Sequence, residues 1–237
     1  INPAVVLFAD ANAAPGLLAK AFDLDNSGAL FAALNRVMSG VAPASLLTKS
    51  WENTKEQFPA GALHLRFSDN HEAVRAVARF GLSGALTVQA LMMTLDGVPL
   101  LYNGMEVGDA TESADPALFE KMPVFWQASG RPPLRAIYRS LIKLRKESPA
   151  FQNDAVTWLS NSAPAEVVTF LRKDDKDEFL VALNLSSRVV VGVVAVPAAD
   201  TFSVLKIEGM PPVLKSTLPD FRLDGYEWHI YRRSLSK

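Results

Sequence analysis

Four polar residues, Asp69, Asn70, His71 and Glu72, directly follow the apolar alternating segment LHLRF at residues 63–67. Alternation of this kind is typical of a strand, and the residues after the polar cluster change to helical spacing. Carboxylate, amide and imidazole groups can together bind hydroxyl groups, exchange protons and stabilise positive charge. The cluster therefore indicates a candidate site at the end of a strand.

Two other apolar runs also end in polar side chains. The run VVLF at residues 5–8 precedes Asp10. The run VPLLY at residues 98–102 precedes Asn103 and Glu106, for which a structural turn is the preferred interpretation. Strands that alternate with helices pair in parallel, and such folds collect their chemistry at the carboxyl ends of the strands. We therefore expect the acidic side chains of all three runs at one rim of the sheet.

Strand-like and helix-like segments alternate over the first 150 residues. Apolar residues recur at helical spacing in several segments, and short apolar or β-branched runs lie between Gly, Asn and Ser residues. The sequence predicts strands at residues 5–8, 21–26, 63–67 and 98–102, and helices at residues 29–40, 46–57 and 77–95 and around residues 137–144. This alternation predicts an α/β fold with a parallel sheet.

The character of the chain changes near residue 150, after Ser148 and Pro149 end the last of these helices. Five β-rich runs separated by turn-forming or charged residues favour a small antiparallel sandwich. We therefore expect two domains, residues 1–150 and residues 151–237. The β-rich runs are residues 166–173, 178–186, 188–197, 201–209 and 226–233.

The composition argues against several classes of function. A net charge of −1 over 237 residues, with scattered basic residues, argues against a nucleic-acid partner. The chain has no cysteine, which excludes a thiol nucleophile and leaves the cellular compartment open. The most apolar stretch, residues 85–102, is interrupted by Gln89 and Asp96, so we expect no membrane span. His64 and His71 have no third metal ligand in view and no nucleotide fingerprint is present, so we expect no metal and no cofactor.

The segment FSDNHE at residues 67–72 resembles the Phe-x-x-Asn-His-Asp segment at the seventh barrel strand of the α-amylase family, glycoside hydrolase family thirteen. Residues 5–34 resemble the fifth and sixth strands of that family, and residues 98–108 resemble its eighth strand. The β-rich tail, closing with YEWHIYR at residues 226–232, is similar to the family's C-terminal sandwich. The resemblance implies a partial (β/α)8 TIM barrel, strands five to eight, followed by an all-β antiparallel sandwich.

The resemblance also implies roles for four residues. Asp10 stands where the family has its general acid, and Glu72 stands where it has a third carboxylate. Asn70 and His71 match the positions that contact sugar hydroxyls. Both carboxyl side chains differ in length from the family's Glu and Asp, and retaining glycosidases hold two carboxyl groups only about 5 to 5.5 Å apart. One methylene added or removed can therefore move a proton donor out of reach.

The family takes its nucleophile from a Gly-x-Arg-x-Asp segment on strand four, and this chain contains no such segment. We therefore expect the nucleophile outside the chain. The expected parent is a glycoside hydrolase that acts on starch-like glucans or maltooligosaccharides by retaining double displacement. The alternatives are a catalytically impaired carbohydrate-binding relative and an unrelated α/β binding protein. Because half a barrel leaves unpaired edges, the expected protein partner is either the missing N-terminal half-barrel or a second copy.

Overall fold

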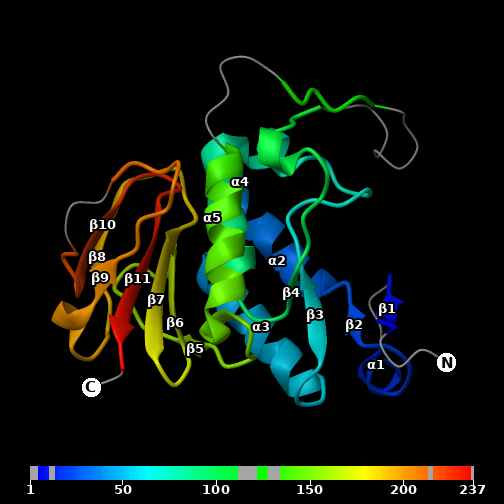
Figure 1. Cartoon of the computed structure of the whole chain (residues 1–237), viewed down its shortest axis with the longest axis horizontal. Helices are drawn as coiled ribbons and strands as arrows, with labels where there is room; N and C mark the ends of the chain where they lie inside the picture. The colour runs from blue at the N-terminus through cyan, green and yellow to red at the C-terminus, as the bar shows by residue number, and fades with distance from the viewer. Residues whose placement is uncertain (1–4, 11–13, 112–121, 128–133, 213–215, 236–237) are drawn as a thin grey trace.

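The computed structural model describes residues 5–10, 14–111, 122–127, 134–212 and 216–235 (Figure 1). Helices α4 and α5 stand in the middle of the molecule, between a parallel sheet on one side and an antiparallel β region on the other (Figure 1). The polypeptide thus forms an α/β part followed by an all-β part, in the order that the sequence predicts.

The parallel sheet has four short strands in chain order, each pairing in parallel with the next. This order confirms the prediction of four parallel neighbours separated by helices, although the strands are shorter than the apolar runs. The strands are β1 (Phe8–Ala9), β2 (Leu24–Asp25), β3 (Leu63–Arg66) and β4 (Val98–Pro99).

The two faces of this sheet have different environments. On one face His64 and Arg66 of β3 lie toward α3, where the His64 ring meets Phe58 edge-on at 4.7 Å. The register pairs Phe8 with Leu24 and Leu24 with Leu63, so these residues form a row on the opposite face. Phe8 and Leu63 are each 41% exposed, whereas Leu24 between them is buried, so the row contacts solvent at its two ends.

Most helices lie where apolar spacing predicts them. One correction concerns residues 77–95, which were expected as one continuous helix, because Gly81 adopts φ 70° and ψ 171° and interrupts it. Only glycine adopts such a backbone conformation without a steric penalty, so the residue type itself permits the break. The helices are α1 (Pro15–Ala21), α2 (Gly28–Met38), α3 (Ser45–Gln57), α4 (Ala76–Thr94) and α5 (Leu134–Glu147), with single 3-10 turns at Met105–Val107, Pro149–Phe151 and Ala199–Thr201.

The antiparallel region contains a five-stranded sheet in the order β5-β6-β7-β11-β9 and a two-stranded sheet of β8 and β10. The β-rich runs predict β6, β7, β8, β9 and β11, whereas β5 and β10 were not predicted. Their bounds are β5 Thr157–Trp158, β6 Val167–Lys173, β7 Asp177–Asn184, β8 Val190–Val193, β9 Ser203–Val204, β10 Asp220–Leu223 and β11 Trp228–Ser234.

The five-stranded sheet is buried on both faces. Alternate residues of β7 point to opposite sides, as in any strand. Phe179, Val181 and Leu183 belong to the core that includes α4 and α5. Leu180 and Ala182 belong to a second core, shared with the two-stranded sheet. This sheet therefore joins the helical layer to the rest of the β region.

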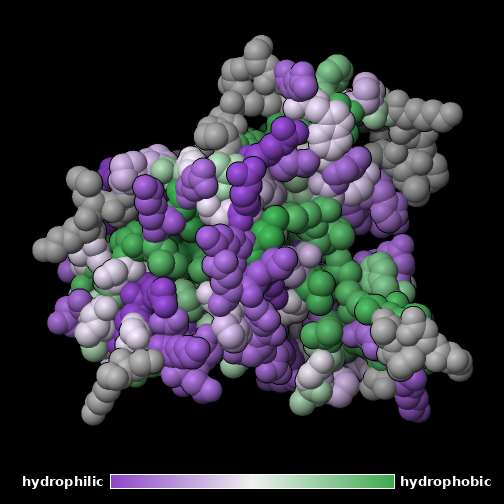
Figure 2. All heavy atoms as spheres, in the orientation of Figure 1, coloured by the Kyte–Doolittle hydropathy of each residue, from purple (hydrophilic) through white to green (hydrophobic). Residues whose placement is uncertain are grey.

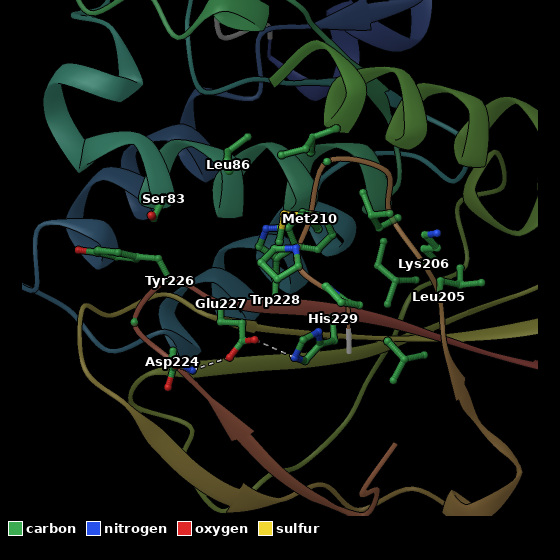
Figure 3. Close-up of a pocket in the computed structure, with 18 of the residues that line it drawn as sticks. Ser83, Leu86, Leu205, Lys206, Met210, Asp224, Tyr226, Glu227, Trp228 and His229 are labelled. Atoms are coloured by element: carbon green, nitrogen blue, oxygen red, sulfur yellow. Dashed lines mark hydrogen bonds and ion pairs between the residues drawn. The ribbon is translucent and has the colours of Figure 1, made fainter. Parts of the chain in front are cut away.

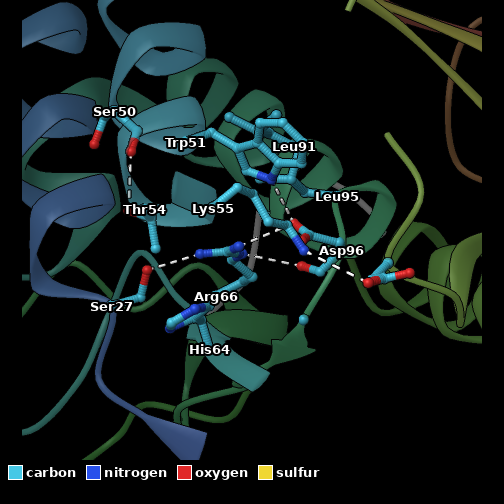
Figure 4. Close-up of polar contacts among 12 residues, drawn as sticks. Ser27, Ser50, Trp51, Thr54, Lys55, His64, Arg66, Leu91, Leu95 and Asp96 are labelled. Atoms are coloured by element: carbon cyan, nitrogen blue, oxygen red, sulfur yellow. Dashed lines mark hydrogen bonds and ion pairs between the residues drawn. The ribbon is translucent and has the colours of Figure 1, made fainter. Parts of the chain in front are cut away.

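A buried polar network surrounds Asp96, which follows α4 and is 2% exposed (Figure 4). Arg66 of β3 forms an ion pair with Asp96 through Nη2 at 2.9 Å and donates from Nε to the Asp96 carbonyl at 3.0 Å. From α3, the Lys55 ammonium lies 2.9 Å from Asp96 Oδ2, and the Trp51 indole donates to Oδ1 at 2.8 Å. One carboxylate thus connects the sheet, α3 and the end of α4.

Two further arginines bind backbone carbonyls around the same helix end. Arg145 of α5 donates to the carbonyls of Met93 and Leu95 at 3.0 and 2.8 Å. Arg172 of β6 is fully buried and donates to the carbonyls of Thr94 and Ala150 at 3.2 and 3.1 Å. Carbonyls at the end of a helix have no partner within the helix, so these arginines satisfy them and link the β region to α4.

Among the described residues, α4 is the one helix long and apolar enough to span a membrane by length and composition. More than half of it is buried inside the protein, where it packs against α5 and β7. This burial and the break at Gly81 identify α4 as a core helix.

Replacing Arg172 with Met should destabilise the protein by at least about 3 kcal/mol, because it leaves several buried carbonyls without a donor. The matched control is Arg188→Met, since Arg188 forms a 2.6 Å ion pair with Glu166 but its side chain is 74% exposed. In that variant the free energy of unfolding should fall by less than about 1 kcal/mol. Urea unfolding of both variants measures the difference, and similar losses would contradict the role given to Arg172.

Asp96 should make stability fall in acid. Burial alone would raise the pKa of Asp96, but Arg66, Lys55 and Trp51 outweigh burial and lower it from 3.8 to about 2. Because the folded-state pKa is depressed, the carboxylate contributes stability above about pH 4 that is lost as the pH falls toward 2. Unfolding free energies measured across this window should fall by roughly 2 kcal/mol more in the wild type than in Asp96→Asn. If the unfolding free energies of the two proteins fall equally with pH, Asp96 is not the group responsible for the loss of stability in acid.

Candidate functional site

Asp10 lies directly after β1, with its side chain exposed. Asn26, which follows the last residue of β2, donates from Nδ2 to Asp10 Oδ1 at 2.9 Å. This hydrogen bond brings together the carboxyl ends of two neighbouring strands, as expected for polar residues at one rim of a parallel sheet.

The predicted residues Asn70, His71 and Glu72 lie in the loop between β3 and α4. The Glu72 backbone N–H donates to Asn70 Oδ1 at 3.1 Å, which closes a local turn. Asn70 and His71 are partly buried and Glu72 is exposed. Because β1 and β3 both pair in parallel with β2, this loop and Asp10 lie at the same end of the sheet, where the strands have their carboxyl ends. Within the part of the chain that the structure describes, no hydrogen bond joins Asp10 to Glu72.

Asp69 has a structural role that the sequence did not reveal. Its side chain is 3% exposed, Oδ1 accepts the Ala76 N–H at 2.8 Å and Oδ2 accepts the Ser68 hydroxyl at 2.7 Å. Ala76 is the first residue of α4, so Asp69 caps a helix that has no side-chain cap from its own N-cap residue. The carboxylate that caps α4 is therefore Asp69, and Glu72 does not cap the helix.

Arg79 fixes the same loop to α2. Its guanidinium donates to the Val74 carbonyl at 2.7 Å, and also to the Ser68 carbonyl and to the Asn35 side chain. Burial lowers the pKa of Arg79, while the nearby charge of Asp69 acts in the opposite direction. These contacts hold the loop backbone, so the orientation of Asn70 and His71 depends on them.

The loops after β3 and β4 are connected by a buried ion pair. Arg75 Nη2 lies 3.0 Å from Asp109 Oδ2, and the Arg75 guanidinium lies over the Tyr102 ring at 4.6 Å. Gly104 has φ +88°, and a Cβ there would lie 3.1 Å from Arg75 Nη2. Glu106 sits in the 3-10 turn that follows. This part of the rim is therefore built around Arg75.

His64 has a buried carboxylate partner. Its Nδ1 lies 2.6 Å from Asp25 Oδ1 of the neighbouring strand, and both side chains are almost fully buried. Among the described residues, no group of three His, Cys, Asp or Glu side chains is arranged to hold a metal ion.

Comparisons with known proteins point in one direction, although no protein-family model matches the chain. The chain is 26% identical over 178 residues to alpha-amylase MalA of Haloarcula japonica, and 33% identical over 117 residues to a cyclomaltodextrin glucanotransferase of Klebsiella oxytoca. These matches cover 73% and 44% of the chain. The solved maltogenic α-amylase AmyB of Thermotoga neapolitana superimposes over 98% of the chain with a TM-score of 0.79 and 18% identity. These similarities in sequence and in fold support the α-amylase family for this chain.

The chain corresponds to only part of each relative. The matched segments span 26% of the Haloarcula protein and 17% of the Klebsiella protein, and the structural match covers 55% of the Thermotoga chain. The similarity therefore concerns the fold of this chain, while the activity of a whole enzyme is a separate question.

The site geometry predicts stability effects of different size for Asp69 and Glu72. Asp69→Asn should cost about 1 to 3 kcal/mol, because a buried carboxylate that caps α4 and faces Arg79 is lost. Glu72→Gln should change stability by no more than about 0.5 kcal/mol, because the side chain is exposed. Thermal or urea unfolding distinguishes them. A large loss in Glu72→Gln would mean that Glu72 is a structural residue.

Proposed function

We propose that this chain supplies part of an α-glucan-acting glycoside hydrolase, with residues 1–150 forming strands five to eight of a (β/α)8 barrel and residues 151–237 a C-terminal domain. The observation that carries the proposal is the position of the predicted site residues at the carboxyl ends of the parallel strands. Asp10 follows β1, and residues 70–72 follow β3. In barrels of this kind, catalytic residues lie at the carboxyl ends of the strands.

The open face of the parallel sheet supports the proposal of a half-barrel. Apolar side chains are exposed on and beside the four strands, and apolar surface is visible on that side of the molecule (Figure 2). A closed barrel would bury the row that contains Phe8 and Leu63 and would pair the free edges of β1 and β4. The occupant that fits this face is therefore the other half of a barrel, from a preceding segment or from a second copy. The exposed residues are Val5, Val6, Leu7, Phe8, Leu63, Val98 and Leu101.

The proposed reaction is a retaining double displacement. A nucleophilic carboxylate outside this chain attacks the anomeric carbon while Asp10 protonates the departing glycosidic oxygen, which leaves a covalent glycosyl-enzyme. Asp10 then removes a proton from water, and the water oxygen displaces the carboxylate to release the sugar. Glu72 stabilises the positive charge that develops on the sugar ring, and Asn70 and His71 bind its hydroxyl groups.

The second candidate function is binding of α-glucans without catalysis. The observation that favours it is the length of the two carboxyl side chains, because Asp10 is shorter and Glu72 longer than the residues that the family uses. The Asp10 carboxylate also accepts a hydrogen bond from Asn26, which occupies one of its oxygen atoms.

The purified chain alone should not hydrolyse maltooligosaccharides at a useful rate, because it has no nucleophile and an open sheet. Activity should appear when the polypeptide carrying the preceding four βα units is added. In that mixture, Glu72→Gln should lower kcat by about 100-fold or more. The matched control is Glu52→Gln, since Glu52 is an exposed residue of α3 on the helical side of the sheet.

Reducing-sugar release from maltotriose-to-maltoheptaose substrates measures these rates. Turnover by the chain alone that Glu72→Gln abolishes would show that the nucleophile lies within the chain. A mixture that binds maltoheptaose without turnover would favour the binding function.

A further inference from the structure

A cavity of about 530 Å³ lies between the helical layer and the β region (Figure 3). Leu82 and Leu86 of α4 and Ile137 of α5 form one wall, and Leu205 and Met210 contribute from the segment after β9. This volume is within the range typical of small-molecule sites, which often occur at such interfaces. None of the proposed site residues lines this cavity.

Several polar groups of the cavity can donate hydrogen bonds. Trp228 is 2% exposed, and its indole N–H makes no hydrogen bond with any residue that the structure describes. The Ser83 hydroxyl and the Lys206 ammonium likewise have no partner within the described ranges. Figure 3 shows Trp228 at the centre of the site and Lys206 at one end. These donors belong to residues that line the cavity, so they are available to acceptor atoms of a ligand.

The acidic groups of the cavity already have partners. Glu227 accepts the Asp224 N–H at 2.7 Å, and its other oxygen lies 3.3 Å from His229 Nε2. Asp224 forms a 2.7 Å ion pair with Arg222. Burial lowers the pKa of His229, so that ring is neutral and Glu227 keeps its negative charge. At one end of the lining, Lys206 supplies a positive charge that pairs with no acidic side chain in the described ranges.

We propose that this cavity binds a small amphipathic carboxylate, with an apolar body of medium length and an anionic head. The apolar walls would bury the hydrocarbon part, which is the main source of affinity for such ligands. Lys206 and the Trp228 N–H supply the charge and the donor for its oxygen atoms. Because both layers contribute walls, the bound ligand would also hold the β region against α4 and α5.

The test uses the full chain, labelled with ¹⁵N, and sodium octanoate as the probe. The chain has four tryptophans, so the indole N–H spectrum is simple, and Trp228→Phe identifies the Trp228 resonance. Octanoate should shift this resonance saturably and leave that of Trp51, which is bound to Asp96, in place. The uncharged probe 1-octanol should bind at least about threefold more weakly, because it lacks the charge that Lys206 recognises.

Lys206→Gln should remove the preference for octanoate over 1-octanol, while the control Lys173→Gln, at the exposed end of β6, should retain it. Both positions are exposed, and circular dichroism verifies that the variants fold. A Trp228 resonance that does not move with octanoate would overturn the proposal. So would shifts confined to other tryptophans, a preference that survives Lys206→Gln, or a response to maltotriose in place of octanoate. None of these outcomes bears on the proposed glycosidase function, because the residues are different.

Discussion

The buried carboxylate of Asp96 is the interaction on which the rest of the structure depends. It forms ion pairs with Arg66 of the sheet and Lys55 of α3, and it lies at the end of α4. A buried charge that loses a partner is strongly destabilising, so these elements cannot separate independently. Arg145 and Arg172 extend the constraint by binding carbonyls at the same helix end. The parallel sheet, the helices and the β region are thereby fixed around one point.

This arrangement has a consequence for the opposite face of the sheet. The polar side chains of β3 point to the helices, where Asp25 and Asp96 pair with them, so the apolar side chains must point the other way. Phe8 and Leu63 are thus exposed because the polar network fixes which face of the sheet points toward the helices. A partly exposed apolar face next to two free edges is the physical basis for the half-barrel proposal.

Local patterns are sufficient to predict the four parallel strands, most of the other strands and helices, and the rim position of Asp10 and residues 70–72. They could not predict interactions between residues remote in sequence. Asp69 caps a helix that starts seven residues later, and Arg172 binds carbonyls 19 to 78 residues away. The break at Gly81 was missed because a single glycine in an apolar helix is often tolerated. β5 has only two residues, and β10 has four with no sustained apolar run, so neither gave a periodic signal.

The central claim is that the rim formed by Asp10 and residues 70–72 binds an α-glucan. The most direct measurement is the histidine spectrum during titration of maltotriose into the chain assembled with its preceding βα units. The chain has three histidines. His64 is buried against Asp25, and His229 lines the cavity between the helical layer and the β region. The account predicts that maltotriose shifts the His71 ring resonances saturably and leaves those of His64 and His229 unchanged. An unmoved His71 resonance, with maltotriose bound elsewhere, would contradict it.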